Sequence, residues 1–297
     1  MKQTLKRKLV QCAAAVITNA NLSGFATGTL YRGPLKQVCV PGLNCYSCPG
    51  ALGSCPIGAL QQVISSGRYP VSFYVAGLLL AFGVTLGRFI CGFLCPFGLI
   101  QEWIHQIPSP KLKLRRAFVA IKYVVLVVFV LLLPLLAAQS AGPAFCRFIC
   151  PAGTLTGGIP LLIADQRLRG VIGWLFSLKS VILALTLLGC TLIYRFFCRV
   201  LCPLGAIYSL FNKISLYQLR FCGEQCVHCG VCAAVCKMGV NPAERPADPE
   251  CIRCGDCASA CPAKALRMGF SHGRRGEASP CLYAHDRAKR PSRRIKQ

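Results

Sequence analysis

The sequence predicts a mainly α-helical protein, with a transmembrane domain of four helices and a small C-terminal α+β domain that is organised by cysteines. Three properties lead to this prediction. The chain is strongly apolar, with 54% hydrophobic and only 14% charged residues among 297. Soluble domains of this length seldom have so large an apolar share, so a membrane protein is the favoured class. The net charge is +25 with basic residues flanking the apolar stretches, and the 22 cysteines recur at fixed spacings.

Four apolar stretches are long enough to cross a bilayer, which takes about 20 helical residues. We place them near 8–30, 70–90, 117–139 and 171–195. The first is interrupted by Asn19 and Asn21, and its basic start also resembles a cleavable signal peptide. Apolar character continues to Leu30, however, which favours a retained helix. The transmembrane domain is therefore expected over residues 1–215.

Lysines and arginines indicate which side of the membrane each connection faces. The N-terminus is basic, and the connection after the second span carries Lys111, Lys113, Arg115 and Arg116. The connections 31–69 and 140–170 carry fewer positive charges for their length. We therefore expect a multi-pass protein of the cell membrane, with both termini in the cytoplasm near anionic lipid. The tail 271–297 is basic and without apolar periodicity, and is predicted to be disordered.

Two cysteine runs near the C-terminus give the clearest indication of chemistry. They are Cys226-x2-Cys229-x2-Cys232-x3-Cys236 and Cys251-x2-Cys254-x2-Cys257-x3-Cys261. Bacterial ferredoxins with two [4Fe-4S] clusters have this spacing, and the fourth cysteine of each run binds the other run's cluster. Cluster 1 would then take Cys226, Cys229, Cys232 and Cys261, and cluster 2 would take Cys251, Cys254, Cys257 and Cys236. We therefore predict a two-[4Fe-4S] ferredoxin domain over residues 216–270.

Zinc and disulfides explain these two runs less well. Structural zinc sites usually take two cysteine pairs separated by a longer spacer, or mixtures of cysteine and histidine. The closely spaced triplets place neighbouring cysteines poorly for bridging each other. Iron-sulfur clusters are the favoured interpretation.

A second cysteine motif is repeated in the membrane half. Cys-x3-Cys-Pro-x-Gly occurs three times, and the first outer connection carries a variant. The spacing puts both sulfurs on one face of a helical turn, the proline ends or bends that helix, and the glycine permits close backbone approach. The expected topology brings two groups together: at the inner face Cys91, Cys95, Cys198 and Cys202, and at the outer face Cys45, Cys48, Cys55, Cys146 and Cys150. Each face is predicted to hold one further metal or redox site, so one or two clusters could add to the first two. Structural disulfides are the alternative for the outer group, which faces an oxidising compartment.

Other cofactors are not expected. The four histidines lie outside the spans, which argues against intramembrane haem, and neither a C-x-x-C-H haem attachment site nor a dinucleotide-binding G-x-G-x-x-G motif for flavin or NAD is present. The basic residues are not interleaved with aromatics as in nucleic-acid-binding surfaces. Residues 97–107 could line a quinone pocket. Lys122 and Lys179 lie inside spans and are expected to extend toward the interface, although Lys179 could face a cluster or a quinone. The chain is predicted to be an electron-transfer subunit rather than a stand-alone enzyme.

The Cys-x3-Cys-Pro motifs at Cys91 and Cys198, together with four spans and the runs Cys226–Cys261, resemble ferredoxin-type membrane proteins of the NapH kind, which are related to the membrane parts of NosR-type proteins. The resemblance covers nearly all of residues 70–265. It implies a bacterial inner-membrane protein that passes electrons between the quinone pool, or a cytoplasmic donor, and a redox partner protein. The outer cysteine set departs from the family's usual form. A second implied function is a redox assembly or regulatory polyferredoxin, which reduces a metal ion or maintains a partner reductase or oxidase.

Overall fold

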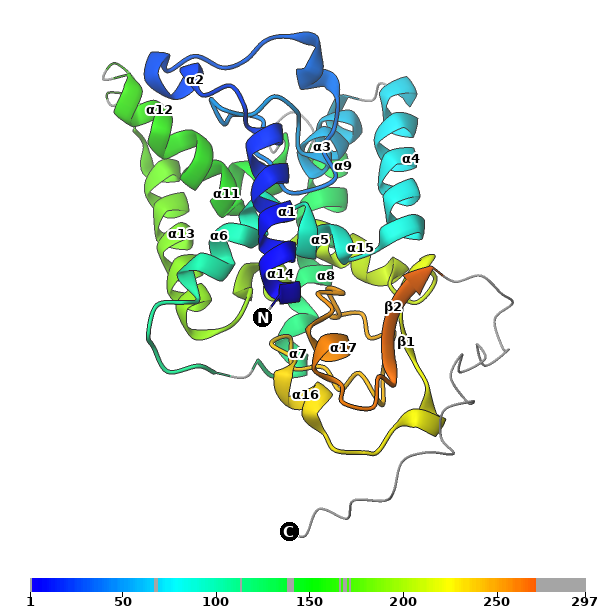
Figure 1. Cartoon of the computed structure of the whole chain (residues 1–297). Coiled ribbons are helices and arrows are strands. Elements are labelled where there is room, and N and C mark those ends of the chain that lie inside the picture. The colour runs from blue at the N-terminus through cyan, green and yellow to red at the C-terminus, as the bar shows by residue number, and fades with distance from the viewer. Residues whose placement is uncertain are drawn as a thin grey trace.

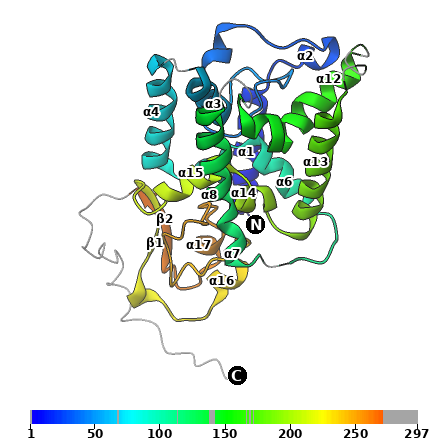
Figure 2. The ribbon, with the colours of Figure 1, turned by 180° about the vertical axis from the view of Figure 1, so that it is seen from behind.

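The computed structural model describes residues 2–66, 69–112, 114–137, 142–165, 167, 170 and 172–270. The predicted tail at 271–297 and Lys113 in the basic connection lie outside this part of the chain. The described residues are mainly helical and include a two-stranded sheet. Figures 1 and 2 show a layer of upright helices, with a smaller segment containing β1, β2, α16 and α17 at one end of it.

Two helices in the described part of the chain are long and apolar enough to cross a membrane. One runs from Arg116 to Leu136, and the other is α13 (Trp174–Leu192). They correspond to the third and fourth predicted spans. The first of them is irregular and consists of α7 (Arg116–Val119), α8 (Ile121–Val125), the π-helical η2 (Leu126–Leu132) and α9 (Leu133–Leu136). Pro134 lies in α9, where it lacks an N–H and crowds the preceding turn, which agrees with the widened π turns just before it.

The other two predicted spans are shorter helices. α4 runs Tyr69–Leu86, near its predicted bounds, and α1 runs Lys2–Thr18. The predicted first span, 8–30, is therefore wrong in its bounds, because the helix starts earlier and ends at Thr18. Asn19 caps this end by donating to the Ala15 carbonyl at 2.9 Å, and the short α2 (Ser23–Thr27) follows. Four membrane crossings stay a prediction.

Short helices fill the space between these longer ones and carry the cysteine motifs. Toward the sheet end lie α5 (Phe89–Phe93), α6 (Pro96–Ile104), α14 (Phe196–Val200) and α15 (Pro203–Phe211). Toward the opposite end lie η1 (Pro34–Gln37), α3 (Pro56–Ser66), η3 (Phe145–Ile149), α11 (Pro151–Gly153), η4 (Thr154–Gly158) and α12 (Ile159–Ala164). Except for η1 and α12, these short helices contribute apolar side chains to a core that they share with α4, α8 and η2.

The C-terminal segment folds around a small antiparallel sheet. β1 (Tyr217–Phe221) pairs with β2 (Leu266–Phe270), in a register that places Tyr217 opposite Phe270. Between the strands lie η6 (Gly223–Gln225), α16 (Val231–Val235) and α17 (Asp256–Ala260). Leu219, Cys257 and Leu266 form its own buried cluster.

A buried group of charges attaches this segment to the helices. Glu250 forms ion pairs with Arg88, at 2.9 Å, and with Lys122, and neither cation has an exposed side chain. The Asn212 amide donates to the carbonyls of Asp248 and Cys251 at 2.9 and 2.8 Å. The expectation that Lys122 extends to the interface is therefore wrong. Its charge is balanced inside the protein.

Candidate metal centres

The Cys-Pro-x-Gly motif places a sulfur at the start of a helix. Cys202 is the N-cap of α15, and its Sγ accepts a hydrogen bond from the backbone N–H of Gly205 at 3.4 Å. The other three copies repeat this contact between the glycine N–H and the cysteine sulfur, at Cys55, Cys95 and Cys150. Proline suits the first helical position, where its missing N–H would have had no partner. Each motif therefore presents a sulfur to helix N–H groups, which favour a thiolate.

In two copies of the Cys-Pro-x-Gly motif the glycine is required, because the helix that the motif begins packs against the turn that carries the preceding cysteine. A Cβ atom at Gly98 would lie 3.0 Å from the Cys91 carbonyl oxygen, and one at Gly205 would lie 2.9 Å from that of Cys198. Real Cβ contacts are rarely this close. The glycine thus lets the two sulfurs of one Cys-x3-Cys motif face the same space.

The inner site, as we call Cys91, Cys95, Cys198 and Cys202, is assembled from two segments about one hundred residues apart in sequence, α5–α6 and α14–α15. The four side chains are between 3% and 5% exposed. Burial raises the pKa of Cys202 well above its usual value, and the neighbouring thiols of Cys198, Cys91 and Cys95 raise it further. The structure thus brings the four predicted inner cysteines together in an apolar core.

Two arginines connect the two halves of the inner site, because each donates to a backbone carbonyl of the opposite half. Arg88 lies three residues before Cys91 and donates to the Cys198 carbonyl at 3.2 Å. Arg195 lies three residues before Cys198 and donates to the Cys91 carbonyl. Neither arginine is among the predicted site residues, although the sequence Arg-Phe-x-Cys leads into each inner motif and could have indicated them. Two buried cations beside four thiols offset the negative charge that thiolate ligands would bring.

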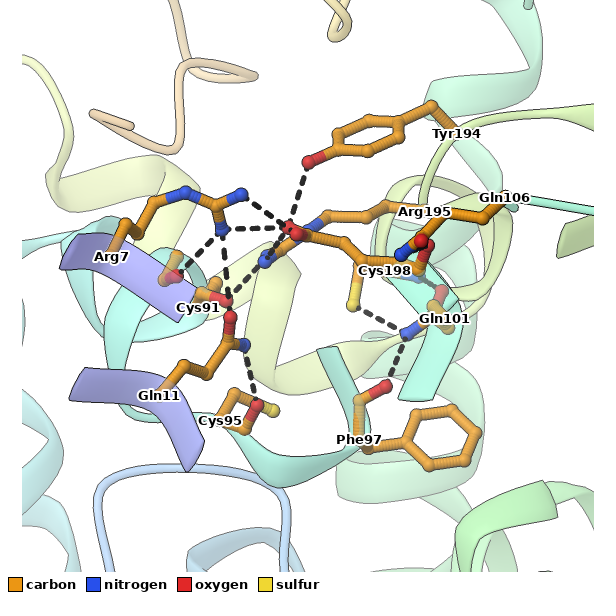
Figure 3. Close-up of polar contacts among 12 residues, drawn as sticks. Arg7, Gln11, Cys91, Cys95, Phe97, Gln101, Gln106, Tyr194, Arg195 and Cys198 are labelled. Carbon is orange, nitrogen blue, oxygen red and sulfur yellow. Dashed lines mark hydrogen bonds and ion pairs between the residues drawn. The ribbon is translucent and has the colours of Figure 1, made fainter. Parts of the chain in front are cut away.

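A second buried ion group lies on the α1 side of the inner site (Figure 3). Glu102 pairs with Arg7 at 2.7 Å and with Arg195. Arg7 also donates to the Gly92 carbonyl at 3.1 Å, and Gln11 donates to the Cys95 carbonyl at 2.8 Å. Burial opposes the charged form of Glu102, but Arg195 and Arg7 outweigh it and lower its pKa to about 2. The α1 helix is thereby fixed to the backbone of the cysteine turn.

The outer site contains four of the five predicted cysteines. Cys45, Cys55, Cys146 and Cys150 line one cavity of about 720 Å³, together with Lys36 and Lys179. Burial raises the pKa of Cys146 well above its usual value, and Cys150, Cys55 and Cys45 raise it further. Lys179 donates to the Cys146 carbonyl at 3.3 Å, so it faces this site and not the membrane interface.

Cys48 is separate from the other outer cysteines. Its thiol points to Asn19 Oδ1 at 3.8 Å, and it lines a different cavity, which it shares with Cys45. All five outer cysteines are free thiols, so the disulfide alternative is not what the structure contains.

The two C-terminal runs line two further cavities. One contains Cys236, Cys251, Cys254 and Cys257, and the other contains Cys226, Cys229, Cys232 and Cys261. These are the same two groups of four that the ferredoxin rule assigns to clusters 2 and 1. Both loops follow one path, with left-handed backbone at His228 and Gly230 in the first run and at Arg253 and Gly255 in the second.

The cluster 2 group lies against the inner site. Ile252, between Cys251 and Cys254, packs tightly on Gly92. A Cβ atom added at Gly92 would lie 2.7 Å from the carbonyl oxygen of Ile252. Cys236 and Cys254 pack on the core that contains Cys91 and Cys198. In the part of the chain described, no three or more His, Cys, Asp or Glu side chains are arranged to hold a single metal ion. The donor set of each group of four is sulfur alone, which suits iron-sulfur chemistry.

Comparison with known proteins gives a family match in the part of the chain that precedes the two C-terminal cysteine runs. Residues 68–115, 122–164 and 168–220 match a family model described as a 4Fe-4S binding domain. Each of these segments contains one Cys-x3-Cys-Pro motif. The match therefore falls on the repeated Cys-x3-Cys-Pro motif and stops before the two C-terminal runs.

Curated proteins match this chain over longer stretches. An uncharacterized protein of Methanocaldococcus jannaschii is 28% identical over 64% of this chain and 76% of its own length. The methylamine utilization ferredoxin-type protein MauN of Methylorubrum extorquens is 28% identical over 71% of this chain and 70% of its own. The protein NirI of Paracoccus denitrificans is 31% identical over 50% of this chain and 21% of its own. No solved structure matches.

Proposed function

This chain belongs to a ferredoxin-like family of 4Fe-4S proteins, and from this premise we propose that it is a membrane-bound electron-transfer protein with four cluster sites. The two C-terminal groups, the inner site and the outer site would each hold one [4Fe-4S] cluster. When bound, each cluster supplies a one-electron carrier. The predicted four-span topology and the domain limits 1–215 and 216–270 are part of this proposal.

The observation that carries the proposal is the order of the four cysteine groups in space. In Figure 1, α3 of the outer site lies toward one end of the molecule, α5 and α14 of the inner site lie in the middle, and α16 and α17 lie at the other end; Figure 2 shows the same order for α3, α14 and α16. Gly92 of the inner site touches Ile252 of the cluster 2 loop. Cys229, in the cluster 1 group, is exposed. The row thus runs from the outer cavity to a surface where a redox partner could dock.

The distribution of charge supports a cytoplasmic position for the C-terminal segment. The N-terminus and the connection that leads from α6 to α7 lie at the same end as α16 and α17 (Figure 1). This connection carries Lys111 and Arg115, and Arg116 is the first residue of α7. Cytoplasmic connections are enriched in lysine and arginine. We therefore propose a protein of the bacterial cell membrane, with the 216–270 segment in the cytoplasm.

A mostly apolar cavity beside the outer site supports quinone as one electron donor or acceptor. It has a volume of about 470 Å³, and α1, α6 and α12 contribute to its lining. Its lining includes Phe97 and Trp103 of α6 and the two outer cysteines Cys45 and Cys48. Ligand pockets are typically apolar clefts of about 300–1,000 Å³ with a few polar groups. An apolar, redox-active lipid that entered here would lie next to a ligand of the outer site.

Iron content and quinol oxidation test the proposal. Anaerobically prepared protein is expected to contain about sixteen irons, four per cubane. Cys198→Ser with Cys202→Ser should remove about four of them, and so should Cys146→Ser with Cys150→Ser. Cys48→Ser is the matched control and should remove none.

A second measurement separates electron transfer from assembly. Addition of a short-chain quinol to the oxidised protein should produce the low-temperature EPR signals of reduced clusters. In the iron measurement, a content of about eight irons per chain would reject clusters at the inner and outer sites. Full iron content with no reduction by quinol, together with loss of a partner enzyme's cofactor in a deletion strain, would favour the assembly function instead.

A further inference from the structure

Two buried glutamines occupy the same place in two copies of the cysteine motif. The copies read Cys55-Pro56-Ile57-Gly58-Ala-Leu-Gln61 and Cys95-Pro96-Phe97-Gly98-Leu-Ile-Gln101. Gln61 and Gln101 are 0% and 1% exposed. Each is six residues after its cysteine and so lies on the helix that this cysteine starts, α3 or α6.

Both side chains reach a sulfur in the facing copy of the motif. Gln101 Nε2 lies 3.0 Å from Cys198 Sγ, and Gln61 Nε2 lies 3.4 Å from Cys146 Sγ. Cys198 and Cys146 are each the first cysteine of a Cys-x3-Cys pair. The Gln101 contact is drawn in Figure 3. One glutamine therefore serves the inner site, and its counterpart serves the outer site.

Backbone groups fix the orientation of both carboxamides. The Oε1 atom of Gln61 accepts from the Phe145 N–H at 2.8 Å, and that of Gln101 accepts from the Cys198 N–H at 3.4 Å. A backbone N–H can only donate, so the amide oxygen must face it and the NH2 group must face the sulfur. The same Nε2 atoms also donate to the carbonyls four residues earlier, Ile57 at 3.2 Å and Phe97 at 3.3 Å.

The facing copies of the motif have other residues at the matching position. These are Tyr208, six residues after Cys202, and Thr156, six residues after Cys150. Their hydroxyls donate to backbone carbonyls, Tyr208 to Pro41 at 2.9 Å and Thr156 to Ala152 at 2.8 Å. The glutamine is thus a feature of one copy in each facing pair, and it makes the two halves of each site unequal.

We propose that Gln61 and Gln101 are equivalent positioning residues, each of which donates an N–H···S hydrogen bond to one cluster ligand and raises the reduction potential of the cluster at its own site. This inference rests on the proposed function, since it requires clusters at the outer and inner sites. Hydrogen bonds to the sulfurs are one of the determinants of cluster potential. An added electron increases the negative charge on the ligand sulfur, so the donor stabilises the reduced form more than the oxidised form.

Site-directed variants with a redox titration followed by EPR test this inference on the intact protein. Gln101→Met removes the amide with little change of volume, and should shift the inner cluster to lower potential while the outer cluster stays unchanged. Gln61→Met should do the reverse. We expect about a tenfold change in the reduction equilibrium, which is about 59 mV for one electron. Gln101→Leu and Gln61→Leu repeat the test if a methionine variant does not fold.

Gln11→Met is the matched control. Gln11 is a fully buried glutamine beside the inner site, but it donates to the Cys95 carbonyl and not to a sulfur. A merely structural role would make Gln11→Met and Gln101→Met equivalent. The inference is overturned if the reduction potential of the inner cluster is the same in Gln101→Met, Gln11→Met and the wild type and all three have full iron content. The proposed function would then stay intact. Absence of both membrane clusters from the wild-type protein would overturn the proposed function itself, and the inference with it.

Discussion

Removal of one buried charge is expected to loosen the attachment of the C-terminal segment to the helices. Among the described residues, Glu250 is the one acidic side chain that pairs with Arg88, at 2.9 Å, and with Lys122, two cations whose side chains are not exposed. In Glu250→Gln both cations would stay buried without a counter-charge. Removing one partner of a buried ion pair costs about 3–5 kcal/mol.

The size of the effect of Glu250→Gln on docking follows from the position of the Glu250 ion pairs. It joins residue 250 to α8 and to the residue before α5, so its loss weakens the docked state and leaves the strand pairing of β1 with β2 intact. About 1.4 kcal/mol corresponds to a factor of ten in an equilibrium constant. A cost of about 3 kcal/mol should therefore lower the ratio of docked to undocked protein about 10²-fold.

Amide hydrogen exchange in a detergent micelle or nanodisc measures this ratio. Exchange of amides in residues 248–254 should accelerate about 10²-fold in Glu250→Gln, if exchange there requires undocking. Glu244→Gln is the control, because Glu244 is an exposed glutamate of the same segment. The double variant Lys122→Met with Glu250→Gln should recover part of the loss, since one of the two unpaired cations is gone. Equal exchange in Glu250→Gln and Glu244→Gln would refute the reasoning.

Three further predictions concern the cysteine sites. Gly98→Ala places a Cβ atom 3.0 Å from the Cys91 carbonyl oxygen, so it should reduce iron content by about four atoms per chain, measured with acid-labile sulfide. Glu102 has a pKa of about 2 in the folded protein, against a usual value of 4.5. Its ionised form therefore stabilises the fold fully above pH about 4.5 and progressively less as the pH falls toward 2. The melting midpoints of the wild type and of Glu102→Gln should differ by a constant amount above pH about 4.5 and should converge as the pH falls toward 2. Lys179→Met removes a cation that lines the outer cavity, and should lower the potential of the outer cluster alone in an EPR-monitored titration.

Local spacing predicted the cysteine groups well because each motif is a short helical unit. The expected inner group of Cys91, Cys95, Cys198 and Cys202 comes together in the structure, since both halves use the same turn and the same helix start. Cys48 was predicted with the outer group and lies elsewhere. Its position depends on the chain reversal at Asn19, whose side chain it contacts, and spacing alone carries no information about that contact.

Long-range charge pairing explains the main errors. The predicted first span begins near residue 8, whereas α1 begins at Lys2 and contains Arg7, which is buried and pairs with Glu102, 95 residues away. Lys122 was expected to reach the interface, but its partner Glu250 is 128 residues away. A sequence pattern reveals the cost of burying one charge and not the distant group that offsets it.

The position of Arg88 has a consequence for the whole molecule. One guanidinium touches the backbone of the inner site, at the Cys198 carbonyl, and the carboxylate of Glu250 beside the second C-terminal run. If both sites hold the proposed clusters, this buried side chain would help to keep the two electron carriers at a fixed spacing. Tunnelling between them would then occur over a constant gap, insensitive to bilayer thickness or lipid composition. Under this proposal, regulation of the electron flow would act at the two ends of the row.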